Sequence, residues 1–284
     1  MKNMIPRLLI FFIGVPLIIA LVLLLPQFNH LCISVVVVVA SALASVELAE
    51  MLGTKGLRIS GIEAGIFGAL APAATVAVIN FYASFWFIPL LVFAAISWIL
   101  IALVLLPMQE QDSIISRLAA RLVVLIYPGA FLAWICGMGK WSGEIILLFL
   151  LIPMANDGTA WAAGMLFGKG NRGIVPVSPN KSIAGFVGGL LASVLAGALA
   201  ALFLPGIFKP RFLSPVLAGS LLGLVTGIFA NLGDLCESAI KRSAGYKDSG
   251  KMFPGRGGML DSVDSIAMAA PAFYFAFKIL FFLG

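Results

Sequence analysis

Long apolar runs constrain this chain more than any other feature of its sequence. Nine runs predict membrane-spanning helices, since a helix needs about 20 apolar residues to cross about 30 Å of bilayer hydrocarbon. Helices are expected because lipid offers no hydrogen-bond partner to an open backbone group. The predicted spans are residues 8–28, 31–52, 61–81, 85–106, 118–138, 145–167, 183–204, 212–232 and 265–282.

The composition supports this interpretation. Of the 284 residues, 62% are hydrophobic and only 11% are charged, whereas about a quarter are charged in ordinary soluble domains. These fractions exclude an ordinary soluble enzyme, and they exclude a disordered chain, which would be poor in apolar residues. We therefore predict an all-α, polytopic integral membrane protein with about nine transmembrane helices. The least regular spans are the third, which carries Glu63, and the fifth, which has Pro128 and Gly129 in its middle.

The positive charges are divided unevenly by the predicted spans. If the N-terminus lies inside, 14 of the 18 Lys and Arg residues fall on the inner side, and Lys140, Lys209, Arg211 and Lys278 fall outside. Lys and Arg are enriched in cytoplasmic loops, so this split predicts a cytoplasmic N-terminus. It also places the polar segments 168–181 and 233–264 together on the cytoplasmic side.

The acidic residues suggest where chemistry occurs. The chain has one histidine, His30, so histidine catalysis and a His-ligated zinc site are not expected. Acids near abundant cations suggest a hard divalent cation and phosphate instead. Asp157 lies past the middle of the sixth run, where a carboxylate costs about 2.5–3.5 kcal/mol on insertion scales. It is either functional or a paired structural acid at a helix broken by Pro153.

Two polar segments have the composition of an anion site. Residues 168–182 are rich in glycine and cations, which supply N–H groups and positive charge to a phosphate. In the segment 233–264, the spacing of Asp234, Ser238 and Lys241 suits one face of a helix. A tight turn is expected at 254–258, before the i,i+3 pair Asp261 and Asp264. Two such carboxylates can bind Mg²⁺ together with substrate phosphates, although any single acid here can also be a solvated loop charge.

The C-terminal segment resembles the signature of the phosphatidate cytidylyltransferase, or CDP-diacylglycerol synthase, family. It reads Ser238-x-x-Lys241-Arg242-x4-Lys247-Asp248-x-Gly250-x3-Pro254-Gly255-x-Gly257-Gly258-x-x-Asp261-x-x-Asp264. Upstream, Ser178-Pro-Asn-Lys181-Ser182 and Asn156-Asp157 are similar to two further family blocks. The likeness covers roughly residues 156–189 and 231–271. Arg256 stands where the family usually has His, and Ser262 where it usually has Arg.

The resemblance implies an Mg²⁺-dependent nucleotidyltransferase of phospholipid biosynthesis. CTP and phosphatidic acid would give CDP-diacylglycerol and pyrophosphate, with no nucleic-acid partner. It implies a homodimer in the bacterial inner (plasma) membrane, with its active site on the cytoplasmic side. Residues 1–140 (spans 1–5) would form a scaffold and possible dimer surface, and residues 141–284 (spans 6–9) the catalytic region.

The resemblance also implies roles for particular residues. Catalysis is expected at Asp234, Asp261 and Lys181, and metal binding at Asp234, Asp261, Asp264 and Asp157. Substrate binding is expected at Ser178, Ser238, Lys241, Arg242, Lys247 and Arg256.

Other interpretations of the same residues stay open at this stage. A secondary transporter of an anionic solute also has intramembrane acids and glycine-rich spans. A related lipid kinase or another nucleotidyltransferase would use a similar set of cations and acids. The small-residue spacings Gly185/Gly189 and Gly219/Gly223/Gly227 allow close helix packing, either within one subunit or at a dimer interface.

Overall fold

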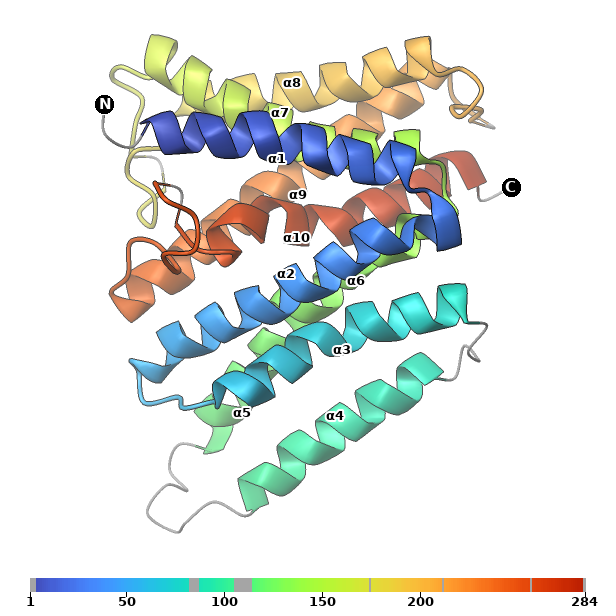
Figure 1. The fold of residues 1–284 in the computed structure, drawn as a ribbon. Helices are drawn as coiled ribbons and strands as arrows, with labels where there is room; N and C mark the ends of the chain where they lie inside the picture. The colour runs from blue at the N-terminus through green and yellow to red at the C-terminus, as the bar shows by residue number, and fades with distance from the viewer. Residues whose placement is uncertain are drawn as a thin grey trace. The chain divides into compact units, whose positions relative to one another are not determined.

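The computed structural model describes residues 4–81, 87–104, 114–173, 175–210, 212–255 and 257–282, and over these it is helical with no β-strand, which confirms the all-α prediction. The helices are α1 Met4–Leu24, α2 Gln27–Gly53, α3 Gly61–Asn80, α4 Phe87–Val104, α5 Ile114–Val124, η2 Leu125–Ala130, α6 Phe131–Gly137, η3 Met138–Lys140, α7 Gly143–Phe167, α8 Ile183–Phe203, α9 Pro215–Ala244, α10 Leu260–Phe277 and η4 Lys278–Phe282 (Figure 1).

Seven helical segments within the described residues are long and apolar enough to cross a membrane, which supports an integral membrane protein. They are Gln27–Gly53, Gly61–Asn80, Ile114–Lys140, Gly143–Phe167, Ile183–Phe203, Pro215–Ala244 and Leu260–Phe281. The first and fourth predicted spans correspond to α1 and α4, and within the residues whose side chains the structure describes their apolar segments are Phe12–Leu24 and Ile88–Ala102. Both ends of the predicted span 85–106 lie outside the described residues. The count of nine spans and the orientation of the N-terminus therefore stay predictions.

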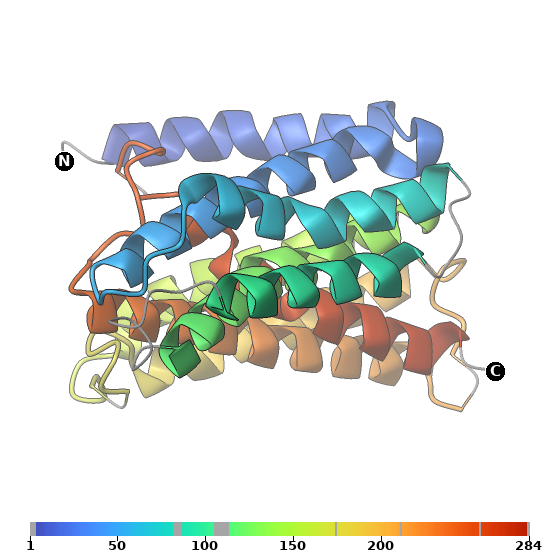
Figure 2. The same cartoon turned by 90° about the horizontal axis from the view of Figure 1, so that it is seen from below.

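The chain divides into two compact units. The first unit comprises Met1–Gly143 and Ile240–Val263, and the second comprises Glu144–Ala239 and Asp264–Gly284. In the first unit, α3 packs against α2, α4 and α6 (Figures 1 and 2). Ser60 caps α3 by accepting a hydrogen bond from the backbone N–H of Glu63 at 3.1 Å. The Glu63 carboxylate pairs with Arg121 Nε at 2.9 Å, so a charge inside the third apolar run is accounted for by a partner on α5.

The fifth predicted span contains a π-helical turn at its proline. Proline lacks an N–H and cannot continue a regular α-helical ladder, and η2 carries Pro128 between α5 and α6. The hydroxyl oxygen of Ser41 on α2 lies 2.6 Å from the carbonyl oxygen of Pro128 and 2.7 Å from that of Gly68. The hydroxyl has one hydrogen, so it can donate to one of these two carbonyls at a time. A polar side chain from a neighbouring helix thus lies within hydrogen-bond distance of a backbone carbonyl at the irregularity, as apolar surroundings require.

In the second unit, glycines bring helices into close contact. A methyl group added at Gly197 on α8 would overlap the carbonyl oxygen of Gly219 on α9, and one at Gly223 would overlap the carbonyl oxygen of Ser193. Gly185 and Gly189 face α7 in the same way, against Ala160 and Asn156. These small residues therefore serve packing within one chain, which decides between the two alternatives for their spacing.

Apolar side chains complete the second unit. Phe149, Phe208, Phe273 and Phe277 are buried, and the ring centroids of Phe149 and Phe273 lie 5.3 Å apart. These rings pack α7 and α10 together away from the polar ends of the helices.

Candidate functional site

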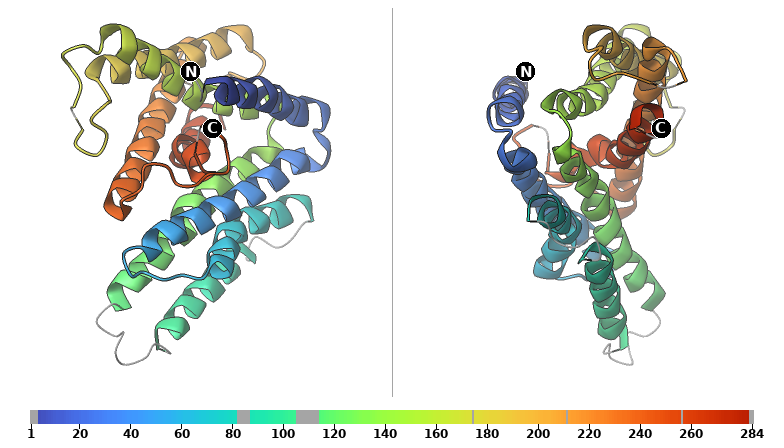
Figure 3. Two further views of the ribbon diagram at one scale, coloured as in Figure 1. Left: turned by 60° about the vertical axis from the view of Figure 1, so that its left-hand side comes forward. Right: turned by 90° about the vertical axis from the view of Figure 1, so that its right-hand side faces the viewer.

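The segment that carries the signature forms the end of α9, a loop, and the start of α10 (Figure 3). The loop turns at Gly245, Gly255 and Gly257, whose φ angles of 81°, 78° and 113° favour glycine. Phe253 and Gly257 exchange two backbone hydrogen bonds, of 2.8 and 3.1 Å. The tight turn predicted at 254–258 is thus present, although Arg256 itself lies outside the described residues.

Asp261 is the centre of this loop. Its Oδ1 pairs with Lys241 Nζ at 2.5 Å. Its Oδ2 accepts hydrogen bonds from the backbone N–H groups of Ser249 and Gly258, at 2.7 and 2.8 Å. The side chains of Lys241 and Asp261 are only 12% and 7% exposed. Charge-assisted hydrogen bonds of this kind are strong, so both predicted site residues are held in a fixed geometry.

Glu47 on α2 also contacts this loop, and sequence reasoning missed it. Its Oε1 accepts from the N–H of Met259 at 2.8 Å, and its Oε2 from the N–H of Leu260 and the hydroxyl of Ser249, both at 2.9 Å. One signal was available: Glu47 is an acid inside the second apolar run, and an intramembrane acid is by default a functional candidate.

A second group of predicted residues meets in the second unit. Lys181 Nζ lies 2.5 Å from Asp234 Oδ2, and the Ser238 hydroxyl donates to Asp234 Oδ1 at 3.4 Å. Lys181 is held by its loop, because the N–H of Gly173 donates to its carbonyl oxygen at 3.1 Å and its own N–H donates to the Ser178 carbonyl oxygen at 3.1 Å. The side chains of Lys181 and Asp234 are 22% and 32% exposed, but the Lys181 Nζ atom itself is buried.

Asp157 and Asp264 form a third group, also in the second unit. The Ser265 hydroxyl oxygen lies 3.1 Å from Asp157 Oδ2 and 3.3 Å from Asp264 Oδ1. A hydroxyl has one hydrogen and donates to one carboxylate at a time, so Ser265 links the two acids, and its backbone N–H also donates to Asp264 Oδ1 at 2.6 Å. α7 continues through Pro153, so Asp157 does not lie at a helix break.

The predicted cations Arg242 and Lys247 are exposed. Arg242 donates from Nη1 to the carbonyl oxygen of Tyr246 at 3.4 Å, and Lys247 lies in the loop. The signature side chains thus gather as Lys241 with Asp261 in the first unit, and as Lys181 with Asp234 and Asp157 with Asp264 in the second.

The arrangement of the acidic side chains indicates which of them could bind the predicted Mg²⁺. Among the residues that the structure describes, no three His, Cys, Asp or Glu side chains gather as a metal site by themselves. Mg²⁺ is usually held by one or two carboxylates together with waters and substrate phosphates, so the pair Asp157 and Asp264 fits that ion. Asp261 fits less well, because both its oxygens already accept hydrogen bonds from Lys241, Ser249 and Gly258.

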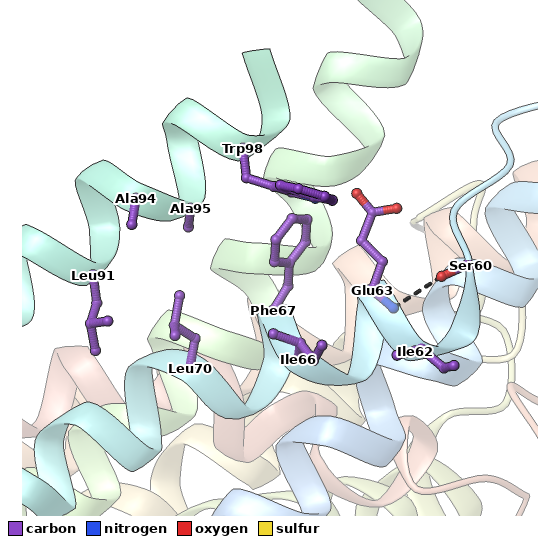
Figure 4. Close-up of a pocket in the computed structure, with 10 residues that line it drawn as sticks. All are labelled: Ser60, Ile62, Glu63, Ile66, Phe67, Leu70, Leu91, Ala94, Ala95 and Trp98. Atoms are coloured by element: carbon purple, nitrogen blue, oxygen red, sulfur yellow. Dashed lines mark hydrogen bonds between the residues drawn. The ribbon is translucent and has the colours of Figure 1, made fainter. Parts of the chain in front are cut away.

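A pocket in the first unit lies apart from these residues. It has a volume of about 470 Å³ between α3 and α4, and Phe67, Leu70, Leu91 and Trp98 are among its lining residues. Figure 4 shows Trp98 beside Phe67, with Glu63 at the polar end. None of the predicted site residues lines this pocket, so we assign the candidate site to the polar loops.

Comparison with known proteins places these loops in a family. The model of the cytidylyltransferase family matches residues 5–280. The phosphatidate cytidylyltransferase of Staphylococcus haemolyticus is 32% identical over 234 residues, which are 82% of this chain and 85% of that protein. The phosphatidate cytidylyltransferase of Thermotoga maritima is 34% identical over 178 residues, 61% of this chain and 63% of that protein.

Other matches are shorter. The Escherichia coli relative named "Uncharacterized protein YnbB" is 40% identical over 138 residues, which are 47% of this chain and 43% of that protein. Most of these alignments thus span less than two thirds of the relative's own length. The family model nevertheless spans almost the whole chain, and the resemblance seen in the polar loops is confirmed: the chain belongs to the cytidylyltransferase family.

Proposed function

We propose that this protein transfers the CMP moiety of CTP to phosphatidic acid, giving CDP-diacylglycerol and pyrophosphate for phospholipid biosynthesis. The observation that carries the proposal is the family match together with the signature loop, in which Lys241 and Asp261 are fixed against each other at 2.5 Å. The names of the Staphylococcus and Thermotoga relatives support the same activity.

The chemistry explains why cations and acids are paired in the polar segments. A phosphate oxygen of phosphatidate attacks the α-phosphorus of CTP, the bond from that phosphorus to the β-phosphate oxygen breaks, and pyrophosphate leaves with the bonding electrons. The attacking phosphate is already ionised, so no strong general base is needed. Both reactants are anions, so the site must hold them in line and offset their charge.

We assign the cations to the phosphates. Lys181 lies in a glycine-rich loop, and its Nζ atom is buried beside Asp234, so we propose that it exchanges that carboxylate for a phosphate oxygen of CTP when the pair opens. The Ser238 hydroxyl contacts Asp234, and the Ser178 carbonyl oxygen accepts from the N–H of Lys181, so we assign both serines to this part of the substrate site. Lys241, Arg242, Lys247 and Arg256 belong to the signature segment, and we propose that they hold the triphosphate and the lipid phosphate.

We propose that Mg²⁺ is the cofactor. Asp157 and Asp264 would hold it, and Asp234 is a further candidate ligand in the same unit. When bound, the ion would offset charge on the triphosphate. Asp261 orients Lys241 and the loop in this arrangement, and it would take part as a ligand only if the Lys241 contact opened.

We also propose a homodimer in the bacterial inner membrane, with the site on the cytoplasmic side. The inner bias of Lys and Arg supports this orientation, and CTP is a cytoplasmic substrate.

One assay tests the proposed function. Purified protein in detergent with labelled CTP, phosphatidic acid and Mg²⁺ is expected to form a lipid-soluble cytidine product, and ATP in place of CTP is expected to give none. Asp261→Asn should abolish turnover while leaving the protein folded. Normal turnover by Asp261→Asn would contradict the site, and a labelled lipid formed only from ATP would favour a lipid kinase.

A further inference from the structure

The start of α10 depends on a carboxylate from the N-terminal half of the chain. The first N–H groups of a helix have no partner within that helix, and α10 begins at Leu260. The N–H groups of Met259 and Leu260 donate instead to Glu47 on α2, at 2.8 and 2.9 Å. A negative charge at a helix N-terminus is also favoured by the helix dipole, so Glu47 stabilises the first turn of the helix that carries Asp261.

Two glycines of the signature leave room for this carboxylate. A Cβ atom at Gly250 would lie 2.5 Å from Glu47 Oε1, and one at Gly258 would overlap Glu47 Oε2. A Cβ atom cannot lie this close to a carboxylate oxygen, so only glycine fits at positions 250 and 258 while Glu47 stays in place. The signature glycines and Glu47 are therefore parts of one packing arrangement, although they are far apart in the sequence.

Ser249 connects Glu47 to Asp261. Its buried hydroxyl oxygen lies 2.9 Å from Glu47 Oε2 and 2.8 Å from Asp261 Oδ2, and it accepts from the N–H of Asp261 at 3.2 Å. Hydrogen bonds in such a buried network reinforce one another. A displacement of Glu47 is thus transmitted to the carboxylate that holds Lys241.

We propose that Glu47 is a positioning residue for the transfer reaction. It acts through Met259, Leu260 and Ser249, which fix the orientation of Asp261 and of the glycine turn. This inference rests on the proposed function, and it gives α2, assigned above only to a scaffold, a direct part in building the site.

Kinetics of three Glu47 variants test the proposal, with Glu50→Ala as the matched control because Glu50 is an exposed acid on the same helix. Glu47→Ala is expected to lower kcat at least about tenfold, as loss of residues that orient a site usually does, with a smaller change in KM for CTP. Glu47→Gln should also be impaired, because its amide nitrogen cannot accept from a backbone N–H. Glu47→Asp keeps the carboxylate and should recover part of the loss.

Hydrogen exchange of the full chain in detergent gives a readout that does not require activity. Glu47→Ala should speed exchange at the amides of Ser249, Met259 and Leu260, whereas Glu50→Ala should not. Ser249→Ala should add little to the kinetic loss of Glu47→Ala, because the two residues act through one network. Normal kcat, unchanged exchange, or an equal loss in Glu50→Ala would overturn the inference. Failure of the wild-type protein to form product would instead overturn the proposed function.

Discussion

Lys241 offers the sharpest test at the scale of single residues. Lys241→Met keeps most of the side-chain stem but removes the charge that faces Asp261. The side chains of Lys241 and Asp261 are only 12% and 7% exposed. Breaking a buried pair from one side costs up to about 3–5 kcal/mol. We expect turnover to fall at least about 100-fold and the unfolding temperature in detergent to drop. Lys251→Met, an exposed lysine of the same loop, is the control, and normal turnover by Lys241→Met would contradict the assignment.

Lys181 and Asp234 should behave as one unit. They touch at 2.5 Å, and effects of contacting residues on free energy are not additive. We expect Lys181→Met and Asp234→Asn each to lower kcat/KM, and the double variant to be little worse than the more impaired single one. Lys169 is exposed in the same loop, so Lys169→Met combined with Asp234→Asn should show additive effects. Additivity in the Lys181 pair would show that the contact has no part in the reaction.

At the scale of elements, the contact between α8 and α9 should tolerate no added carbon. A methyl group at Gly223 would overlap the backbone of Ser193, and overpacking of a tight interface usually costs about 1–3 kcal/mol. Gly223→Ala is therefore expected to lower the unfolding temperature in detergent. An added Cβ at Gly14 on α1 would have no atom within 4 Å. Gly14→Ala should therefore leave the unfolding temperature unchanged or raise it. Equal effects of the two substitutions would contradict the close packing of α8 on α9.

The sequence predicts the helices of this protein better than it predicts the contacts between distant residues. The apolar runs predict the helices because lipid leaves a backbone few alternatives, and Pro128 marks the irregular fifth span, where a π-helical turn is found. Lys241 and Asp261 follow as site residues from a motif within one short segment, but their pairing does not, because the motif assigns Asp261 to metal and Lys241 to substrate. Glu47 does not follow, because its partners Ser249 and Met259 are 202 and 212 residues away. Helical periodicity carries no information about such tertiary contacts.

At the scale of the whole molecule, the uneven distribution of Lys and Arg predicts which loops face the cytoplasm. The cations of the segments 168–181 and 233–264 contribute much of the inner excess of Lys and Arg, and we assign several of them to phosphate binding. If these cations are present because they bind phosphate, their number does not indicate which side of the membrane the loops face. The side must therefore be measured by a method that does not depend on charge.

Cysteine labelling supplies that measurement. Cys32 and Cys236 are exposed and would first be replaced by Ser, after which Lys251→Cys in the signature loop and Gly206→Cys after α8 each provide one exposed thiol. In sealed cells, a membrane-impermeant maleimide should label Gly206→Cys and not Lys251→Cys, and in inverted vesicles the pattern should reverse. Labelling of Lys251→Cys from outside would place the loop away from cytoplasmic CTP. It would show that the cations of this loop do not follow the positive-inside rule, and it would contradict their assignment to the phosphates of cytoplasmic CTP.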